Sequence, residues 1–325
     1  MSVVEMNRVL VTGAGGFIGR HTLSPLLAAG FEVHAATSRE PRRGGPPAVR
    51  WHRRDLLEPG SARALIKSSR PTHLLHLAWF LNPPAHLAAE VNLDWVQASL
   101  GLLGAFRAAG GRRAALAGTY AEYSSQPAVH CLEGETPISP TSLYGAAKHG
   151  LHVIAAAWAR QTGLELCWAR IFNVYGPHEH ATSLVGAVAR ALLRGEEVAT
   201  SHGRQVRDYI FVEDLGRALV ALLRSDVAGA INMASGVPVR LGEVIAAIAA
   251  ETERPELVRV GALPQRPGES ERSTADVRRL RDEVGWSPSV GLREGAQLTV
   301  EWWRFALAGT PSYALAQRRR REPVR

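Results

Sequence analysis

The chain has 325 residues, of which 46% are apolar and 21% are charged, so it can bury a sizeable core in one or two globular domains. Its two cysteines, Cys131 and Cys167, predict neither a disulfide framework nor a metal site. We expect no secretory signal, because the first residues lack a basic segment followed by an apolar core. No apolar run is long enough for a membrane span, so a cytoplasmic location is expected.

The formal net charge of +8 does not by itself indicate a nucleic-acid-binding protein. Much of the excess arginine stands in QRRRREPVR, within a basic tail at residues 311–325 that we expect to be solvated. The remaining basic charge could instead attract an anionic small substrate. Because the sequence has no interleaved aromatic and basic pattern, we expect no nucleic-acid partner.

The first predicted elements are a strand, a tight turn and a helix in RVLVTGAGGFIGRHTLSPLLAAG. An apolar run precedes the glycines, and apolar positions with helical spacing follow them. Glycines at this spacing let the backbone approach a pyrophosphate at the helix N-terminus. A glycine-rich turn without a ligand is the alternative. We predict a dinucleotide-binding turn, with cofactor contacts from Gly13, Gly16, Phe17, Ile18 and Gly19.

The second predicted strand, FEVHAAT, ends at the sequence SRE, with no aspartate. An acidic residue at such a strand end binds a free ribose 2′-hydroxyl, whereas a 2′-phosphate needs hydroxyl and cationic donors. Ser38 and Arg39 therefore predict NADP(H), with NAD less favoured, unless Arg39 is only the first of several loop arginines. The other predicted cofactor contacts are Asp55 and Leu56 near the adenine, and Leu77, Ala78 and Trp79 after a third apolar strand.

A tyrosine and a lysine stand four residues apart in SLYGAAKHG, where a helix is predicted to begin. Tyr144 and Lys148 would share one helix face, although such a pair taken alone is more often surface decoration. The motifs that surround this pair favour a functional role for it over a chance surface position. In order, VTGAGGFIG, HLAW, AGTYAEYS, SLYGAAK, RIFNVYGPHE and GRQVRDYIFVEDL resemble the extended short-chain dehydrogenase/reductase family, in its group of NAD(P)-dependent epimerases and dehydratases of nucleotide sugars.

The resemblance implies that Tyr144 and Lys148 are catalytic and also contact the cofactor. A phenol has an ordinary pKa of about 10. An ammonium one helical turn away, together with oxidised nicotinamide, would lower that pKa. In the family the lysine also hydrogen-bonds the nicotinamide ribose. Thr119 matches the residue that hydrogen-bonds the reacting sugar oxygen, which makes it the third expected catalytic residue.

The resemblance also implies a nucleoside diphosphate sugar as substrate, in contact with Thr119, Tyr120, Asn173, Arg207 and Arg266. The two arginines fall on family positions where a guanidinium can bind phosphate oxygens bidentately, although each singly would more often be a surface ion-pair partner. His178 and His180 lack a clustered third ligand, so we expect them in a loop near the substrate and predict no metal.

The chain departs from the family's 4,6-dehydratases directly after Thr119. Those enzymes carry an Asp-Glu acid/base pair there, whereas this chain has Tyr120 and Ala121. Glu122 is shifted by one residue on a predicted strand end, which would turn it to the other face. Dehydration is therefore disfavoured, which leaves ketoreduction or epimerisation.

We predict NADPH-dependent reduction of the 4-keto group of a nucleotide-linked 4-keto-6-deoxyhexose in deoxysugar biosynthesis, because GTYAEYS is similar to such reductases. An NAD-dependent nucleotide-sugar 4-epimerase is the alternative. A non-catalytic dinucleotide sensor is less favoured, since such proteins typically lose the tyrosine–lysine pair.

The predicted architecture is α/β, with a doubly wound parallel Rossmann sheet over residues 1–172 and a smaller substrate domain over 173–310. The chain is expected to return to the first domain near residues 206–230. Two predicted helices, within residues 86–110 and 144–163, are apolar around much of their circumference. In the family the equivalent pair forms a four-helix dimer interface, so the resemblance implies a homodimer.

Overall fold

Seven strands form one large sheet in which all neighbours run parallel, in the order β10-β6-β5-β4-β1-β2-β3. We describe a computed structural model that covers residues 7–40, 45–124, 130–265 and 270–309. The strands are β1 (Arg8–Thr12), β2 (Glu32–Thr37), β3 (Arg50–Arg53), β4 (His73–His76), β5 (Arg113–Thr119), β6 (Glu165–Ile171) and β10 (Gly229–Met233).

The order of these strands confirms the predicted doubly wound fold. From β1 the chain builds outward through β2 to β3, then crosses back and builds outward on the other side of β1 through β4, β5 and β6. The direction of winding therefore reverses between β1 and β4. In open parallel sheets, ligands bind outside the carboxyl ends of the strands at this reversal point. Residues that follow β1 and β4 are among those predicted to hold a dinucleotide.

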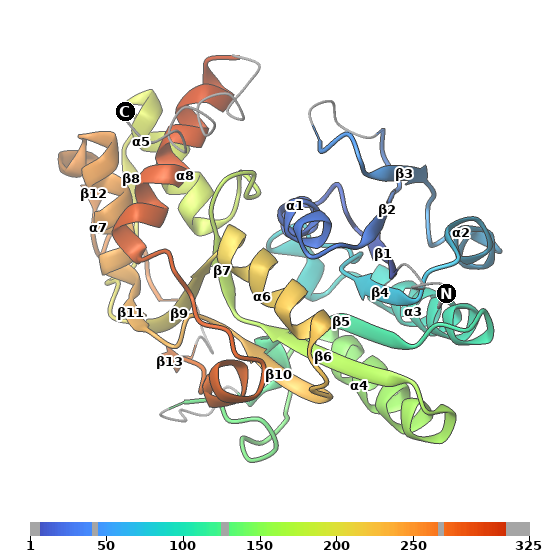
Figure 1. The fold of residues 1–325 in the computed structure, drawn as a ribbon. Coiled ribbons are helices and arrows are strands. Elements are labelled where there is room, and N and C mark those ends of the chain that lie inside the picture. Colours follow the sequence, from blue (N-terminus) through green and yellow to red (C-terminus); the bar gives the residue numbers. More distant parts are fainter. Residues whose placement is uncertain (1–6, 41–44, 125–129, 266–269, 310–325) are drawn as a thin grey trace.

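Helices cover both faces of the large sheet (Figure 1). One face is covered by α1 (Arg20–Ala28) and α6 (Val212–Arg224), which pack against each other. The other is covered by α2 (Ser61–Ser69), α3 (Val91–Ala108) and α4 (Leu143–Thr162). None of the helices in the described parts of the chain is long and apolar enough to cross a membrane.

A second group of elements lies beside the large sheet (Figure 1). A smaller sheet is built on β9, which pairs with β7, β11 and β13. The strands of this group are β7 (Asn173–Tyr175), β8 (Val198–Ala199), β9 (Val206–Phe211), β11 (Pro238–Arg240), β12 (Val258–Arg259) and β13 (Arg272–Ser273). Its helices, α5 (Leu184–Arg194), α7 (Leu241–Thr252) and α8 (Leu292–Leu307), pack on one another around their own apolar cluster.

Two elements from the later part of the chain belong to the large sheet. Helix α6 packs on its face and β10 forms its edge beside β6. Strand β9, by contrast, pairs within the smaller sheet, because its neighbours are β7, β11 and β13. The domain limits expected from the sequence stay a prediction. Arg266 and residues 311–325 of the basic tail lie outside the described residues.

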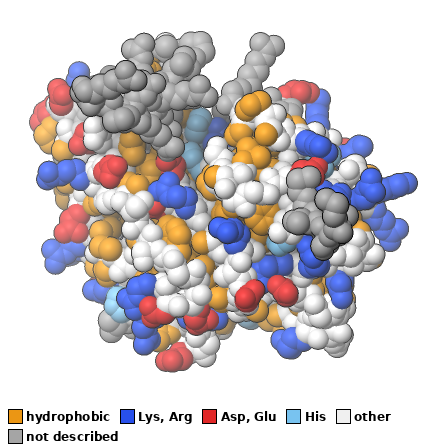
Figure 2. All heavy atoms as spheres, in the orientation of Figure 1, with side chains coloured by type: hydrophobic (Ala, Val, Ile, Leu, Met, Phe, Trp, Pro, Cys, Tyr) orange, Lys and Arg blue, Asp and Glu red, His pale blue; other side chains and the backbone are white. Residues whose placement is uncertain are grey.

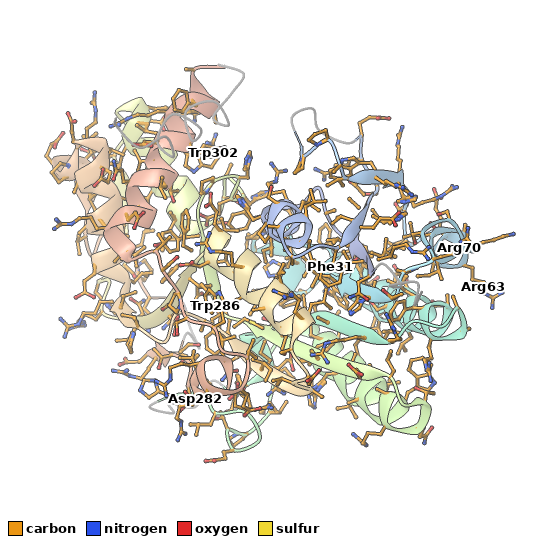
Figure 3. All side chains as sticks on the ribbon, in the orientation of Figure 1. Phe31, Arg63, Arg70, Asp282, Trp286 and Trp302 are labelled. Carbon is orange, nitrogen blue, oxygen red and sulfur yellow. The ribbon has the colours of Figure 1, made fainter. Side chains whose placement is uncertain are left out.

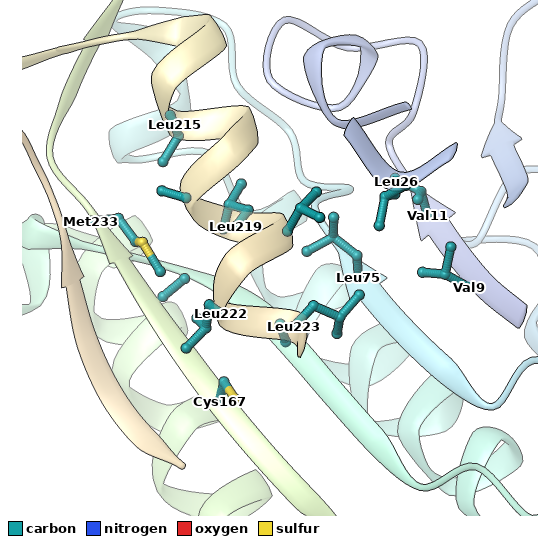
Figure 4. Packing of buried hydrophobic residues seen from close by; sticks show 14 of the residues in the cluster. Val9, Val11, Leu26, Leu75, Cys167, Leu215, Leu219, Leu222, Leu223 and Met233 are labelled. Carbon is teal, nitrogen blue, oxygen red and sulfur yellow. The ribbon is translucent and has the colours of Figure 1, made fainter. Parts of the chain in front are cut away.

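Helix α6 covers an apolar core that lies between this helix and the strands of the large sheet (Figure 4). Leu215, Leu219, Leu222 and Leu223 of α6 are fully buried in one cluster with apolar residues of β1, β4, β6 and β10. Spacings of three and four residues place these leucines on one helix face. The thiol of Cys167 lies in the same cluster, and both cysteines are free and buried.

Basic side chains occur in both halves of the surface in Figure 2, among acidic, apolar and uncharged groups. Several exposed arginines form local ion pairs, such as Arg278 with Asp276 at 2.8 Å and Arg281 with Asp282 at 2.7 Å. Exposed pairs of this kind contribute roughly 0–1 kcal/mol to stability. On the face shown in Figure 2, basic charge is therefore spread among other groups, and some exposed arginines of the chain are neutralised locally.

The position of Leu219 leads to a stability prediction. Leu219→Ala should lower the free energy of unfolding by about 2–5 kcal/mol, because it leaves a cavity under α6. Leu307→Ala, at a leucine of α8 that is 37% exposed, is the matched control and should change stability far less. Urea unfolding followed by circular dichroism measures both variants, and equal losses would contradict the packing described for α6.

Candidate active site

Tyr144 and Lys148 lie in the first two turns of α4. The helix begins after Ser142, whose hydroxyl accepts a hydrogen bond from the N–H of Gly145 at 3.1 Å, as an N-cap residue does. Both side chains are buried, with 8% of Tyr144 and 3% of Lys148 exposed. A phenol and an ammonium one turn apart are thus removed from water together, which a surface pair would not be.

Thr119 brings a third polar group to the same place. It is the last residue of β5, and its hydroxyl hydrogen-bonds the phenol of Tyr144. The two residues are distant in sequence, but helix α4 packs against β5 and the turn that follows it. The structure therefore brings together all three side chains predicted to be catalytic.

The protonation of Tyr144 differs from the expectation. Burial raises the pKa of Tyr144 above its ordinary value, and the opposing influence is the hydrogen bond with Thr119. Lys148 Nζ donates to the carbonyl of Ala117 at 2.8 Å. Burial lowers the pKa of Lys148 to about 7, and the charge of Glu122 works against that shift.

Glu122 holds the end of β5 against β6. Residues Tyr120–Glu122 form a turn of 3₁₀ helix, not the strand end that we expected. The carboxylate is fully buried and accepts hydrogen bonds from the N–H of Thr119 at 2.9 Å, Trp168 Nε1 at 2.8 Å and Arg170 Nε at 3.1 Å. Because these donors occupy it, Glu122 is a positioning group for Thr119. The T-x-x-E spacing, typical of a capping box, was the signal that could have revealed it.

The glycine turn after β1 fits a dinucleotide. A Cβ on Gly13 would lie 2.8 Å from the backbone nitrogen of Ala78, and one on Gly19 would collide with the carbonyl of Gly13. No side chain caps α1, and among the described residues the N–H groups of Phe17 and Ile18 have no hydrogen-bond partner. Free N–H groups at a helix N-terminus are suited to a pyrophosphate.

The other residues predicted to bind the cofactor lie around this turn. Leu77 and Ala78 donate their N–H groups to the hydroxyl of Thr12, each at 3.2 Å, which fixes the segment after β4 beside the end of β1. Ser38 and Arg39 follow β2 and are exposed. No residue from Thr37 to Arg39 carries a carboxylate. Beyond β3, Asp55 is half-buried and Leu56 is buried.

The predicted substrate residues lie on two neighbouring segments. Half-buried Tyr120 stacks on Phe172, with ring centroids 5.4 Å apart. Asn173 and Arg207 lie on the paired strands β7 and β9, and Asn173 Nδ2 donates to the carbonyl of Asp208 at 3.0 Å. Arg207 is 8% exposed and donates to the carbonyl of Val206 at 3.0 Å. The direct contacts of these residues with a substrate stay predictions.

The two histidines after β7 lie in a loop, as expected. The ring of His178 packs against Trp302, with centroids 4.7 Å apart. Trp302 is labelled on α8 in Figure 3. His180 Nδ1 shares a hydrogen bond of 2.8 Å with the hydroxyl of Thr182. The loop therefore links β7 to helix α8 through an aromatic contact.

Two further features near the site were not predicted. The ring of His86 meets Tyr144 edge-on at a centroid distance of 5.0 Å, and no sequence pattern indicated this contact. Ligand atoms of Glu122, His149 and His152 also lie within 4.8 Å of one another. Because Arg170 already neutralises Glu122, these three side chains are poorly suited to hold a metal ion.

These features define a dinucleotide-dependent Rossmann enzyme with a Tyr-Lys-Thr site. Comparison with known proteins agrees. The model of the NAD dependent epimerase/dehydratase family matches residues 9–234, so the chain belongs to that family. Its members include enzymes of nucleotide sugars, such as the UDP-glucose 4-epimerase of Mycolicibacterium smegmatis, 29% identical over 91% of this chain and 98% of the relative.

Two further similarities extend over most of the chain. UDP-glucuronic acid decarboxylase 1 of Xenopus tropicalis is 26% identical, over 94% of this chain and 74% of the relative. The crystal structure of UDP-glucose 4-epimerase from Thermus thermophilus, in complex with NAD, is 32% identical with a TM-score of 0.82, over 92% of this chain and 99% of that one. The similar proteins thus catalyse more than one reaction.

Removing the phenolic oxygen of Tyr144 tests the site. Tyr144→Phe should keep the fold and the cofactor affinity but lower turnover by two or more orders of magnitude, because general acid catalysis contributes about 10²–10⁴-fold. Turnover, thermal unfolding and dinucleotide binding are measured together, with Tyr209→Phe in β9 as the control. Near-full activity would exclude Tyr144 from proton transfer, and lost cofactor binding would indicate a structural role.

Proposed function

We propose that the protein uses NADPH to reduce the 4-keto group of a nucleotide-linked 4-keto-6-deoxyhexose. The observation that carries the proposal is the buried Tyr144 phenol, hydrogen-bonded by Thr119 and adjoining a segment, Tyr120–Ala121, that offers no acid/base pair. The raised pKa keeps the phenol protonated at neutral pH, and the nearby ammonium of Lys148 would favour release of that proton during the reaction. Reduction of a ketone needs a proton donor of this kind, whereas elimination of water needs a separate acid and base.

Each residue of the site has a distinct part in this reaction. Bound NADPH would supply the hydride to the keto carbon. Tyr144 donates its proton to the oxygen that becomes the new hydroxyl, and Thr119 hydrogen-bonds and orients the reacting groups. The ammonium of Lys148 stabilises the phenolate that remains until it is reprotonated. Glu122 keeps the backbone of Thr119 in place through its N–H.

The choice of NADPH rests on the end of β2. Thr37, Ser38 and Arg39 present hydroxyl groups and a guanidinium, and a ribose 2′-phosphate is bound by such donors. Exposed Ser38 and Arg39 are accessible to a cofactor that extends from the glycine turn.

An NAD-dependent nucleotide-sugar 4-epimerase is the second candidate. The relatives favour it, since the similar proteins include 4-epimerases and the Thermus thermophilus structure contains NAD. An epimerase returns the hydride that it removes, so it consumes no reductant. The two candidate reactions use the same Thr119, Tyr144 and Lys148. They differ in whether reduced cofactor is consumed in each turnover.

The reaction is tested with dTDP-, CDP-, GDP- and UDP-linked 4-keto-6-deoxysugars and NADPH. A ketoreductase should oxidise NADPH stoichiometrically and deliver deuterium from labelled NADPH to C4 of the sugar. With an unmodified nucleotide hexose it should form no 4-keto-6-deoxy product. Interconversion of two sugars without loss of reductant, or purification with tightly bound NAD, would favour the epimerase and contradict the proposal.

Arg39 allows a test of cofactor choice. If Arg39 binds the 2′-phosphate, Arg39→Ala should weaken NADPH binding roughly ten- to more than a hundredfold, since a hydrogen bond to a charged group contributes about 1.5–3 kcal/mol. NADH binding should hardly change. Arg50→Ala is the matched control, because Arg50 is an exposed arginine of the neighbouring strand that pairs with Glu32 at 2.7 Å. Equal NADPH and NADH affinities in the unaltered protein would contradict this role.

We also propose a homodimer formed through α3 and α4. These helices pack against each other and leave large apolar side chains exposed, with Leu93 59%, Val153 52% and Ile154 50% accessible. Exposed apolar side chains gathered on adjoining helices favour association. The occupant that fits is a second copy of the same pair of helices.

The dimer is tested by adding a charge to this surface. Ile154→Glu should shift the mass measured by light scattering at micromolar concentration from dimer to monomer, because the interface would bury an unpaired carboxylate. Val260→Glu, at a valine that is 68% exposed in the other half of the molecule, should leave the mass unchanged. A monomeric mass for the unaltered chain would refute the dimer.

A further inference from the structure

Trp79 faces the amino group of Lys148. The residue follows β4 and is half-buried. Lys148 Nζ lies 3.6 Å from the centroid of the Trp79 ring, within the range of a cation–π interaction. One side of the lysine amino group is therefore covered by an aromatic face.

The indole is held in a fixed orientation. Its Nε1 donates to Oδ1 of Asn92 at 2.8 Å, and Asn92 is fully buried. The amide of Asn92 in turn donates to the carbonyls of His86 at 2.8 Å and Ala89 at 2.7 Å. Trp95 stacks on the indole, with centroids 6.0 Å apart and planes at 28°. Rotation of Trp79 would break a hydrogen bond of a buried amide, so the ring is a rigid part of the site.

The Lys148 ammonium has few other sources of stabilisation. Among the described residues its one hydrogen-bond acceptor is the carbonyl of Ala117. Glu122 attracts it from the turn after β5, but that carboxylate is neutralised by Arg170. The remaining titratable groups around it supply no negative charge, since Tyr144 on α4 is protonated and the pKa of His76 on β4, lowered to about 3 by burial, makes that ring neutral. Among the described residues, the indole of Trp79 is an aromatic face in cation–π contact with this ammonium.

We propose that Trp79 is a positioning residue that keeps Lys148 charged and directed at the site of proton transfer. The proposal rests on the proposed proton transfer at Tyr144, in either of the two candidate reactions. Without the indole, the buried amine would lose its proton at lower pH, and the phenolate left after proton donation would lose its counter-charge. A desolvated cation–π contact corresponds to about one pKa unit or more.

The composition of the chain makes this directly measurable. It contains only two lysines, Lys67 and Lys148, and Lys67 is exposed on α2. Lysine labelled with ¹³C at Cε would therefore give two signals in the full-length chain, with Lys67 as an internal reference. Titration of these signals reports the pKa of Lys148 without reference to any substrate.

Trp79→Leu should lower the pKa of Lys148 by about one unit or more and leave that of Lys67 unchanged. Trp79→Phe keeps an aromatic face and should restore most of the shift. Trp158→Leu, at another half-buried tryptophan of the same apolar cluster, is the control and should leave the pKa of Lys148 in place. Circular dichroism verifies the fold of each variant.

A second measurement remains possible even if Trp79→Leu does not fold. Fluorinated tryptophans introduced at position 79 weaken the electron-rich face while keeping its shape, so the pKa of Lys148 should fall stepwise as fluorines are added. An unchanged pKa across Trp79→Leu and the fluorinated series would overturn the proposal. So would a shift of equal size in Trp158→Leu.

Activity provides a separate readout. Since the charged lysine is the active form, activity is lost as pH rises through its pKa, and a lowered pKa in Trp79→Leu should move the alkaline limb of kcat/KM to lower pH by the same amount. If the pKa of Lys148 shifts as expected but Tyr144→Phe stays active, the stabilisation of the Lys148 charge by Trp79 stands, whereas the proposed proton transfer at Tyr144 is refuted. If the alkaline limb stays in place while the pKa moves, Lys148 is not the group that limits activity and the role of Trp79 in proton transfer is refuted.

Discussion

Burial of a phenol and an ammonium side by side is the constraint on which the candidate active site depends. Water is excluded from Tyr144 and Lys148 together, so each charge state must be stabilised by the protein. The stabilising groups come from separate elements, with Thr119 at the end of β5, the Ala117 carbonyl within β5 and the indole of Trp79 after β4. Without the packing of α4 on the sheet, the pair would be two ordinary surface groups.

The parallel sheet explains why these elements meet. Carboxyl ends of neighbouring parallel strands lie at one edge, so the residues after β1, β4 and β5 converge there even though long stretches of chain separate them. Thr12, the last residue of β1, accepts hydrogen bonds from Leu77 and Ala78 and so connects the end of β1 to the segment after β4. Glu122 connects the segment after β5 to β6 by accepting hydrogen bonds from Trp168 and Arg170. The glycine turn and the candidate proton-transfer site thus belong to one edge of the sheet.

Relatives with different reactions share this framework, which places the difference between reactions in a few side chains around it. In this chain the position after Thr119 holds Tyr120 and Ala121, and the nearby carboxylate of Glu122 is engaged in structural hydrogen bonds. The end of β2 holds hydroxyl and guanidinium groups in place of a carboxylate. These local features, more than the shared fold, argue for a reductive reaction.

The sequence by itself determined the glycine turn, the neighbouring positions of Tyr144 and Lys148, and the alternation of strands and helices that makes the sheet parallel. These depend on local spacing, because turn geometry and helix periodicity act over a few residues. Only the tertiary structure decided that Thr119 bonds Tyr144, that Glu122 is occupied by Arg170, and that Trp79 covers Lys148. It also reversed the expected direction of the Tyr144 pKa in this structure, since desolvation depends on groups that the fold brings in from distant parts of the chain.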